Sequence, residues 1–301
     1  MHGIYCSTIP LIAVLMMTLF PVSCPAAEER ETTQLAIAGV DEVSVHAELV
    51  GGETQYVRFP LVVTVRVTNT SEEDRRLASV SETSKALTYH VTELDESGNE
   101  RGPTWTGNRE TWFQRDGGDY HIVLSYESLG PGETRESAAM LTNTIPGLPT
   151  LAVGTYQLLV EYTLRPGRTV EAEPVVFTVK TAPRELEADQ VQAGIQSIKE
   201  GKPTLATTVV AYLTEKGGEG DVDALLTLLD EAQDGMLLYI IGALELVGGQ
   251  KVEHTLDQIR HDRQRADGVR VAASLALKRL EERAEQKNEP EDQSLTEPNV
   301  Q

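Results

Sequence analysis

Two histidines and an aspartate stand at a spacing that suits metal binding. His254, Asp257 and His261 follow one another at i, i+3 and i+7, so a helix would place them on one face. Imidazole nitrogens and carboxylate oxygens are common zinc ligands. An ordinary polar outer face of a helix explains the same spacing and is the preferred interpretation. The three residues are therefore weak metal candidates, and we expect no cofactor.

Other patterns that carry chemistry are missing from the sequence. There is no G-x-S-x-G elbow, phosphate-loop motif or H-E-x-x-H. Asp95, Ser97 and Asn99 alternate like calcium ligands, but a turn between two strands explains them better. We therefore expect that the protein is not an enzyme. The alternative is an enzyme whose active site is assembled from dispersed residues.

Four aromatic residues gather between residues 102 and 120. They include both tryptophans of the chain and are Trp105, Trp112, Phe113 and Tyr120. Clustered aromatic side chains in a long loop suit a binding anchor for a protein or a sugar. The alternative is that they pack the loop onto the body of its domain.

A group of arginines is the densest basic patch in the chain. Its members are Arg260, Arg263, Arg265 and Arg270. Such a patch suits an acidic partner or carboxylates of the chain itself. The alternative is a solvated loop between helices, with Arg270 bonded within its own repeat.

The chain as a whole is strongly acidic. Its formal net charge is −21, from 47 acidic and 26 basic residues among 301. This charge repels phosphate backbones and anionic membrane surfaces. We therefore expect a protein partner and no nucleic acid.

An apolar segment near the N-terminus predicts export. Residues 9–20 are apolar over a length too short for a comfortable membrane span, and residues 24–27 supply small side chains for cleavage. We predict a signal peptide over 1–27 and a flexible segment over 28–34. The mature protein would be periplasmic, envelope-associated or extracellular.

Two cysteines bear on the same segment. Val22-Ser23-Cys24 resembles the end of a bacterial lipobox, so a lipid on Cys24 is an alternative route to a membrane, as is an uncleaved N-terminal anchor. Cys6 and Cys24 are the only cysteines, so a chain cleaved after Ala27 has no disulfide and no thiol.

Between about residues 35 and 182 apolar side chains recur at every second position. The clearest runs, separated by turns rich in Gly, Pro and Asn, are 43–49, 61–68, 87–92, 156–164 and 175–179. Such alternation predicts antiparallel strands with one buried face. Many short strands with regular turns favour a β-sandwich over 35–182.

After Pro183 the apolar spacing becomes helical. Asp234-Gly235 and Asp267-Gly268 each begin an apolar run, while Gly217-Gly218 and Gly248-Gly249 each follow a helix. Residues 236–247 are apolar nearly all round, which predicts a helix buried on several sides. The repeating punctuation predicts about three helix pairs over 183–284, with a helical bundle as the alternative. A disordered acidic tail is expected over 285–301.

Parts of the chain resemble known families. The run VTVRVTNTSEEDRRL, followed by LGPGET and GTYQLLVEY, resembles immunoglobulin-like modules of exported bacterial proteins. Within it, Gly154-Thr155-Tyr156 resembles a tyrosine corner. DGVRVAASLALKRL, residues 267–280, resembles HEAT-like repeats of the phycobilisome-lyase type, and GDVDALLTLLDEAQDGMLLYIIGALELVGG resembles the hairpin before it. The order N-T-S, D-E-S-G, Trp loop, P-G-E and G-T-Y bears a fainter likeness to the intracellular proteinase inhibitors.

These resemblances imply a multidomain β plus α architecture, an immunoglobulin-like β-sandwich followed by a short HEAT-like α-solenoid. The expected function is a non-catalytic interaction or scaffold protein whose helical repeat surface binds a partner protein. The alternatives are carbohydrate or envelope-polymer binding through the Trp-rich loop, and proteinase inhibition. The sequence leaves the partner and the oligomeric state open.

Overall fold

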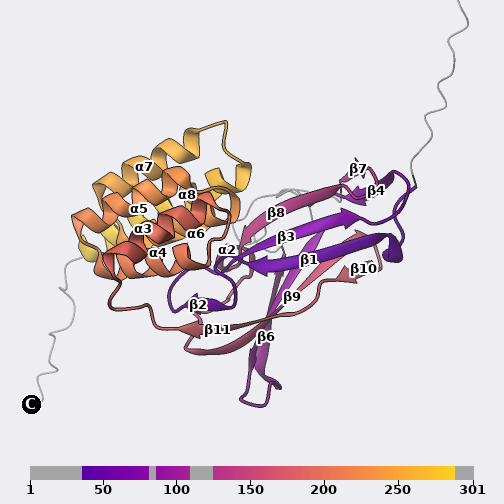
Figure 1. Cartoon of the computed structure of the whole chain (residues 1–301), viewed down its shortest axis with the longest axis horizontal. Coiled ribbons are helices and arrows are strands. Elements are labelled where there is room, and N and C mark those ends of the chain that lie inside the picture. Colours follow the sequence, from indigo (N-terminus) through magenta and orange to yellow (C-terminus); the bar gives the residue numbers. More distant parts are fainter. Residues whose placement is uncertain (1–35, 81–85, 109–124, 289–301) are drawn as a thin grey trace, which may run out of the picture. The chain divides into compact units, whose positions relative to one another are not determined.

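The computed structural model describes residues 36–80, 86–108 and 125–288. They form a β-rich N-terminal part followed by a helical C-terminal part, and together belong to one compact unit (Figure 1). The predicted signal peptide, the flexible segment and most of the predicted tail lie outside the described residues. Among the described helices, none has the length and apolar character needed to cross a membrane.

Two sheets carry most of the β-rich part. The smaller has the order β1-β3-β8, made of β1 (Val43–Leu49), β3 (Val62–Asn69) and β8 (Thr134–Met140). The larger has the order β2-β11-β9-β5-β6, with β10 paired to β9. Its strands are β2 (Thr54–Tyr56), β5 (Leu87–Leu94), β6 (Glu100–Asn108), β9 (Gly154–Arg165), β10 (Arg168–Glu171) and β11 (Val175–Lys180).

Shorter elements complete the β-rich part. A third sheet pairs β4 (Arg75–Ala78) with β7 (Tyr126–Leu129), and the short helices are η1 (Val40–Glu42) and α2 (Leu141–Thr144). The strand pairs are antiparallel, as predicted, except that β2 runs parallel to β11. The five apolar runs singled out in the sequence all lie in strands, apart from Leu61 just before β3, because period-two alternation matches the pleat.

The alternating apolar side chains of the two larger sheets meet in a common core. Val63, Val65 and Val67 of β3 share this core with Leu158 and Val160 of β9, and all five are at most 1% exposed. The hydroxyl of buried Tyr162 donates a 2.5 Å hydrogen bond to the Ala78 carbonyl oxygen, which ties β9 to β4. The β-rich part therefore holds an apolar interior of its own.

Six helices make up the C-terminal part. In chain order they are α3 (Ala188–Lys199), α4 (Thr204–Lys216), α5 (Glu219–Glu231), α6 (Asp234–Val247), α7 (Gln250–His261) and α8 (Asp267–Asn288). The predicted helix starts at Asp234 and Asp267 are confirmed, and both glycine pairs follow helix ends. Helix α8 continues four residues into the predicted tail.

Helix α6 is buried on several sides, as its composition predicts. Tyr239, Ile240, Ile241, Ala243 and Leu244 have no exposed surface. The helix lies between α4 and α8 and also contacts β3 and β8 (Figure 1). A helix that is apolar all round finds partners on every side only in such a central position.

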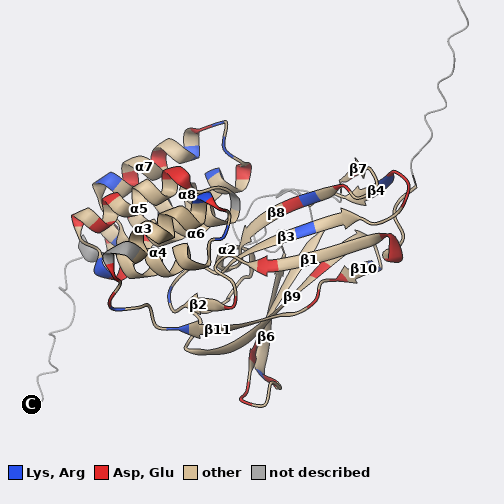
Figure 2. Ribbon diagram, in the orientation of Figure 1, with Lys and Arg blue, Asp and Glu red and all other residues tan. Residues whose placement is uncertain are grey.

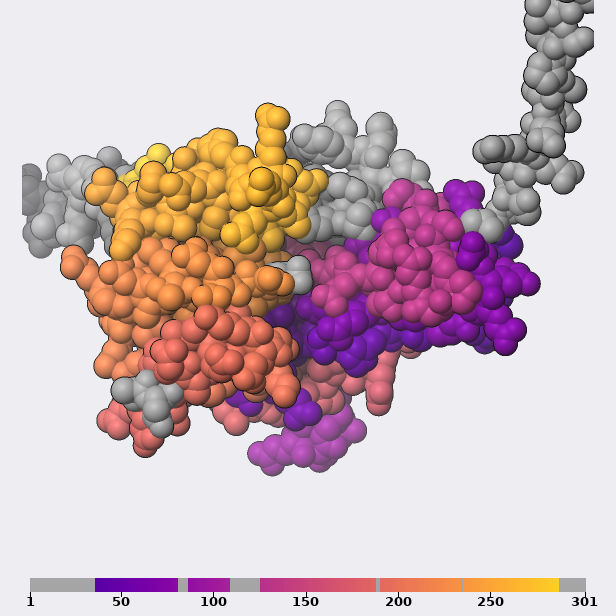
Figure 3. All heavy atoms as spheres, turned by 45° about the horizontal axis from the view of Figure 1, so that its top comes forward, coloured from indigo at the N-terminus to yellow at the C-terminus, as the bar shows by residue number. Residues whose placement is uncertain are grey.

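The helical core extends onto the outer face of the three-stranded sheet. Val50, Phe59, Val62 and Met140 belong to the same hydrophobic cluster as the helices. The prediction of one buried face is therefore wrong for the start of β3: Val62 and Thr64, which point away from the core shared by the two larger sheets, are 0% and 6% exposed. Figure 3 shows helical and strand atoms in direct contact along this junction.

Candidate functional site

The possible metal ligands on α7 make local contacts instead of converging. His254 Nε2 lies 3.1 Å from Gln258 Nε2, and His261 Nδ1 lies 2.8 Å from the Asp257 carbonyl oxygen. Within the described part of the chain, no group of three or more His, Cys, Asp or Glu side chains is placed to hold a metal ion. These residues thus form the exposed polar side of a helix.

The arginine patch spans the loop from α7 to α8, and most of it is paired nearby. Arg260 binds Asp257 at 2.6 Å, Arg265 lies 3.6 Å from Asp262, and Arg270 bonds to Asp267. Arg263 lies exposed in the same loop. Because three of the four charges are paired within α7, α8 and the loop between them, the patch offers a partner little free positive charge.

Of the four aromatic residues between 102 and 120, Trp105 lies in the described part of the chain. Trp105 lies on β6, opposite Val91 of β5, and its half-buried ring packs against the core of the β-rich part. Trp112, Phe113 and Tyr120 lie outside the described residues. For Trp105 the packing interpretation is therefore the one that the structure supports.

The alternating Asp95, Ser97 and Asn99 form a turn. Asp95 Oδ1 accepts hydrogen bonds from the backbone N–H of Ser97 at 2.8 Å and of Asn99 at 2.9 Å. These bonds, that from Asn99 first, lower the pKa of the Asp95 carboxyl. The carboxylate is engaged in holding the hairpin between β5 and β6, as the turn interpretation predicts.

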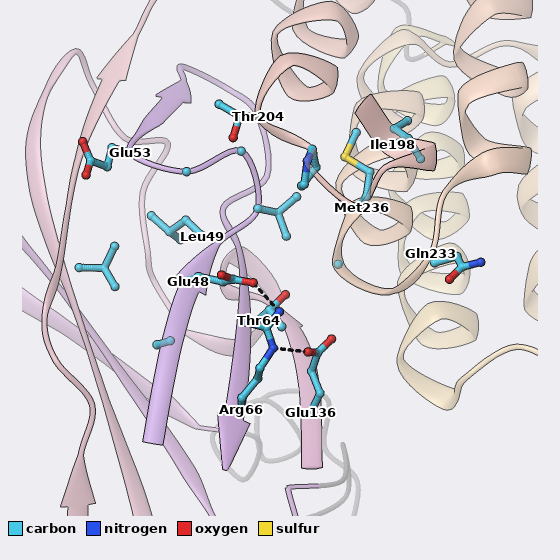
Figure 4. Close-up of a pocket in the computed structure, with 18 of the residues that line it drawn as sticks. Glu48, Leu49, Glu53, Thr64, Arg66, Glu136, Ile198, Thr204, Gln233 and Met236 are labelled. Carbon is cyan, nitrogen blue, oxygen red and sulfur yellow. Dashed lines mark hydrogen bonds and ion pairs between the residues drawn. The ribbon is translucent and has the colours of Figure 1, made fainter. Parts of the chain in front are cut away.

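A large cleft lies where the β-rich part and the helical part of the chain meet. This junction cleft has a volume of about 740 Å³. One wall comes from the end of β1, the turn at Gly51 and Gly52, and the polar side chains of β3 and β8. The other comes from the α3–α4 turn and the α5–α6 loop (Figure 4).

Arg66 of β3 dominates the strand wall of the junction cleft. Its Nε donates to Glu136 Oε2 of β8 at 2.6 Å, and its Nη2 donates to Glu48 Oε1 of β1 at 2.7 Å (Figure 4). The bond with Glu136, and then that with Glu48, raises the pKa of the Arg66 guanidinium. The three side chains form a cross-strand ladder whose charges sum to −1.

The helical wall is also polar. Lys199 at the end of α3 binds Glu231 at the end of α5 at 3.0 Å, and Thr204 and Gln233 stand exposed beside them. Gly51, with φ at +94°, lies so close to α4 that a Cβ there would meet Thr207 Oγ1 at 2.6 Å. A glycine is needed for both the turn and the close approach.

The lining of the cleft is polar and of mixed charge. It holds four glutamates, one arginine and one lysine, together with two threonines, a glutamine, and backbone and apolar groups. Charges are spread over the strands and the helices alike, without a concentration of one sign on either part (Figure 2).

The sequence did not point to this cleft. Its lining comes from segments as far apart as Ala47 and Met236, which the sequence analysis assigned to separate strands and helices. No local sequence pattern links these segments, because they come together only when α6 packs on β3.

Comparison with known proteins adds little. No family model and no curated protein matches the chain. Among solved structures, the chain is similar to the sporulation control protein Spo0M of Bacillus subtilis, at 12% identity and a TM-score of 0.28 over 52% of this chain and 55% of that one. The chain is also similar to a β-glucosidase of Listeria innocua, at 12% identity and a TM-score of 0.26. This match covers 46% of this chain and 16% of the β-glucosidase.

A third similar structure is the alkylpurine DNA glycosylase AlkC of Pseudomonas fluorescens, at 10% identity and a TM-score of 0.26, over 46% of this chain and 31% of that one. The chain thus spans less than two thirds of each of these proteins. At such TM-scores the likeness defines no shared fold. What the structure establishes is a mixed class, mainly antiparallel sheets followed by helices.

Proposed function

We propose that the protein is an exported, non-catalytic binding protein and that the junction cleft receives an extended segment of a partner protein. In this proposal the β-rich part is an immunoglobulin-like sandwich and the helical part is a short HEAT-like solenoid. Export rests on the apolar segment over residues 9–20.

Two structural details support the finer fold assignment. The Tyr156 hydroxyl donates a 3.1 Å hydrogen bond to the Ala152 carbonyl oxygen four residues upstream, as a tyrosine corner does. Consecutive helices also pack in pairs, α3 with α4, α5 with α6 and α7 with α8, and the second helices of successive pairs adjoin. Stacked pairs of this kind are typical of helical repeats.

The binding surface differs from the one that the repeats suggest. The face formed by α4, α6 and α8 would be the natural partner surface of such a stack. Here α6 and α8 pack against β8, and α6 also packs against β3. The chain's own sheet therefore occupies part of that face, and a partner must use what remains beside it.

The junction cleft is the single observation that carries the proposal. Strand β1 is an edge of its sheet, and its last residues line the cleft beside exposed polar side chains from the helices. An edge strand offers unpaired backbone groups to an incoming extended segment, while side-chain pockets select its sequence.

Site-specific crosslinking tests this proposal. A photoreactive amino acid replaces Thr204 or Gln233 in the cleft, and in the control it replaces Thr169, which is exposed on β10. We expect a crosslinked envelope protein from the two cleft positions and not from the control position. The same products from all three positions, or none from the cleft positions, would contradict the proposal.

Blocking the cleft provides a second readout. Thr204→Arg places a long side chain in the cleft without touching the apolar core, since Thr204 is exposed. We expect it to abolish the Gln233 crosslink and to leave thermal unfolding unchanged. Thr169→Arg is the matched control and should preserve the crosslink.

A further inference from the structure

A second recess lies on the segment that joins the two parts of the chain. It has a volume of about 430 Å³. Its walls are the loop between β2 and β3, the linker over residues 181–184, and the C-terminal turn of α4. Because Arg58, Arg184 and Lys216 line it, we name it the basic recess.

The basic recess has an unusual charge for this protein. Three cations and one carboxylate, Glu215, line it. The whole chain carries −21, and the junction cleft is lined by four glutamates and two cations. Such a local excess of positive charge attracts anionic ligands from solution.

The chain itself neutralises these cations poorly. Arg58 Nη1 lies 3.9 Å from Glu215 Oε1, near the limit for an ion pair. Lys216 Nζ lies 4.9 Å from the centre of the Tyr212 ring. The pKa of Lys216 is raised first by a hydrogen bond with Tyr212, and the carboxylates of Asp221 and Glu185 contribute less. Within the described residues, Arg184 has no ion pair. In contrast, Arg66, Arg75, Arg135 and Arg279 all bind carboxylates at 3.1 Å or less.

The backbone at Arg58 is strained. With φ at +73°, it is the one non-glycine residue of the described part with positive φ. The loop is anchored on both sides: Val57 N–H donates to the Lys180 carbonyl oxygen at 2.9 Å, and the Phe59 ring stacks on Tyr239 at 6.1 Å. These anchors hold a largely exposed guanidinium at the edge of the recess. Residues other than glycine in such strained conformations cluster at ligand-binding and active sites.

We propose that the basic recess binds clustered carboxylates of an acidic peptide segment from a partner protein. Arg58 and Arg184 supply planar guanidinium groups that match carboxylates, and Lys216 supplies a point charge above Tyr212. The recess shares no lining residue with the junction cleft and has the opposite charge. This site can therefore exist whether or not the junction cleft binds a partner.

Peptide binding to the full mature chain tests the assignment. The probes are a fluorescent oligoglutamate peptide and an oligoglutamine peptide of equal length, followed by anisotropy. We expect only the acidic peptide to bind, and binding should weaken as salt is raised. Equal binding of the two peptides would overturn the proposal.

Charge-removing variants locate the site. Arg58→Gln, Arg184→Gln and Lys216→Gln should each weaken oligoglutamate binding by about two- to fivefold, the range for exposed ion pairs. Arg168→Gln on exposed β10 removes the same charge elsewhere and should have no effect. Arg58→Gly, which also removes the strained side chain, should weaken binding as Arg58→Gln does. Wild-type affinity in all the recess variants would overturn the proposal.

Two further binding experiments distinguish a partner peptide from other ligands of the basic recess. In the first, free sulfate competes with the labelled peptide, and free glutamate at an equal concentration of carboxylates is the comparison. Equal displacement by the two competitors would replace the peptide assignment with a site for small oxyanions. A chain ending at residue 288 lacks the acidic residues that follow α8. If oligoglutamate bound only to that shortened chain, the occupant would be the chain's own tail and the partner proposal would be wrong.

Discussion

Gly242 of α6 rests directly on Pro60, the proline before β3. A Cβ at position 242 would stand 2.6 Å from Pro60 Cγ and 3.0 Å from its Cβ. Gly235, two turns earlier on the same helix, has the same relation to Val50, at 2.6 Å from its Cγ2. Because neither glycine has a Cβ, the backbone of α6 can lie directly against side chains of the β-rich part. The contact between the two parts of the chain depends on this close approach.

Gly242→Ala should therefore destabilise the protein. The added methyl group must displace the rigid Pro60 ring, which costs about 1–3 kcal/mol, against a gain of up to about 1 kcal/mol in helix propensity. We expect a lower free energy of unfolding by denaturant titration. Gly220→Ala on α5 is the control, because a Cβ there meets nothing within 4 Å. Equal stabilisation of both variants would show that the contact is loose.

Two buried tyrosines should respond in opposite directions to loss of their hydroxyl groups. The Tyr162 hydroxyl is bonded to Ala78, so Tyr162→Phe should cost about 1–2 kcal/mol in unfolding free energy. The Tyr239 hydroxyl is buried and has no hydrogen-bond partner among the described residues. Tyr239→Phe removes that unsatisfied group and should stabilise by about 1 kcal/mol. Destabilisation by Tyr239→Phe as large as that by Tyr162→Phe would contradict this account.

The strain at Arg58 predicts a difference between two substitutions. Arg58→Gly and Arg58→Ala remove the same charge, but only glycine adopts φ near +73° without penalty. The glycine variant should be more stable than the alanine variant by about 1 kcal/mol, measured by denaturant titration. Equal stabilities would mean that the loop relaxes and stores no strain.

Glu245 should make stability depend on pH. Burial raises the pKa of its carboxyl above 4.5, and the 2.9 Å ion pair with Arg279 only partly opposes this. The folded state then binds the proton more tightly than the unfolded state. Stability from this group therefore falls as pH rises from about 4.5, the unfolded value, through the raised folded pKa.

Comparison with Glu245→Gln isolates that effect. The free energy of unfolding of the wild type, minus that of the variant, should increase as pH is lowered through the window above 4.5 and level off below it. Urea titrations at several pH values measure the difference. A difference that is constant with pH, or that shrinks on acidification, would show that Glu245 is not the titrating group.

Local patterns in the sequence predicted the elements well. The run from Val43 to Leu49 is β1, and Asp234 and Asp267 begin helices α6 and α8. The Gly217 residue that follows α4 adopts φ +64°, the left-handed conformation that ends helices. These features depend on side chains a few residues apart, so they can be predicted without knowledge of the tertiary fold.

Residues far apart in the chain decide the rest. The alternation in β3 placed Val62 and Thr64 toward solvent, and only the packing of α6 on that face buries them. The same packing sets Glu48, Arg66 and Gln233 around one cleft, and it brings Arg58 to the linker beside Lys216. Periodicity records which side of an element is apolar, but not which element will cover it. Thus strands, helices, acidity and the apolar N-terminal segment follow from residue order alone, whereas both candidate binding sites arise from contacts across the fold.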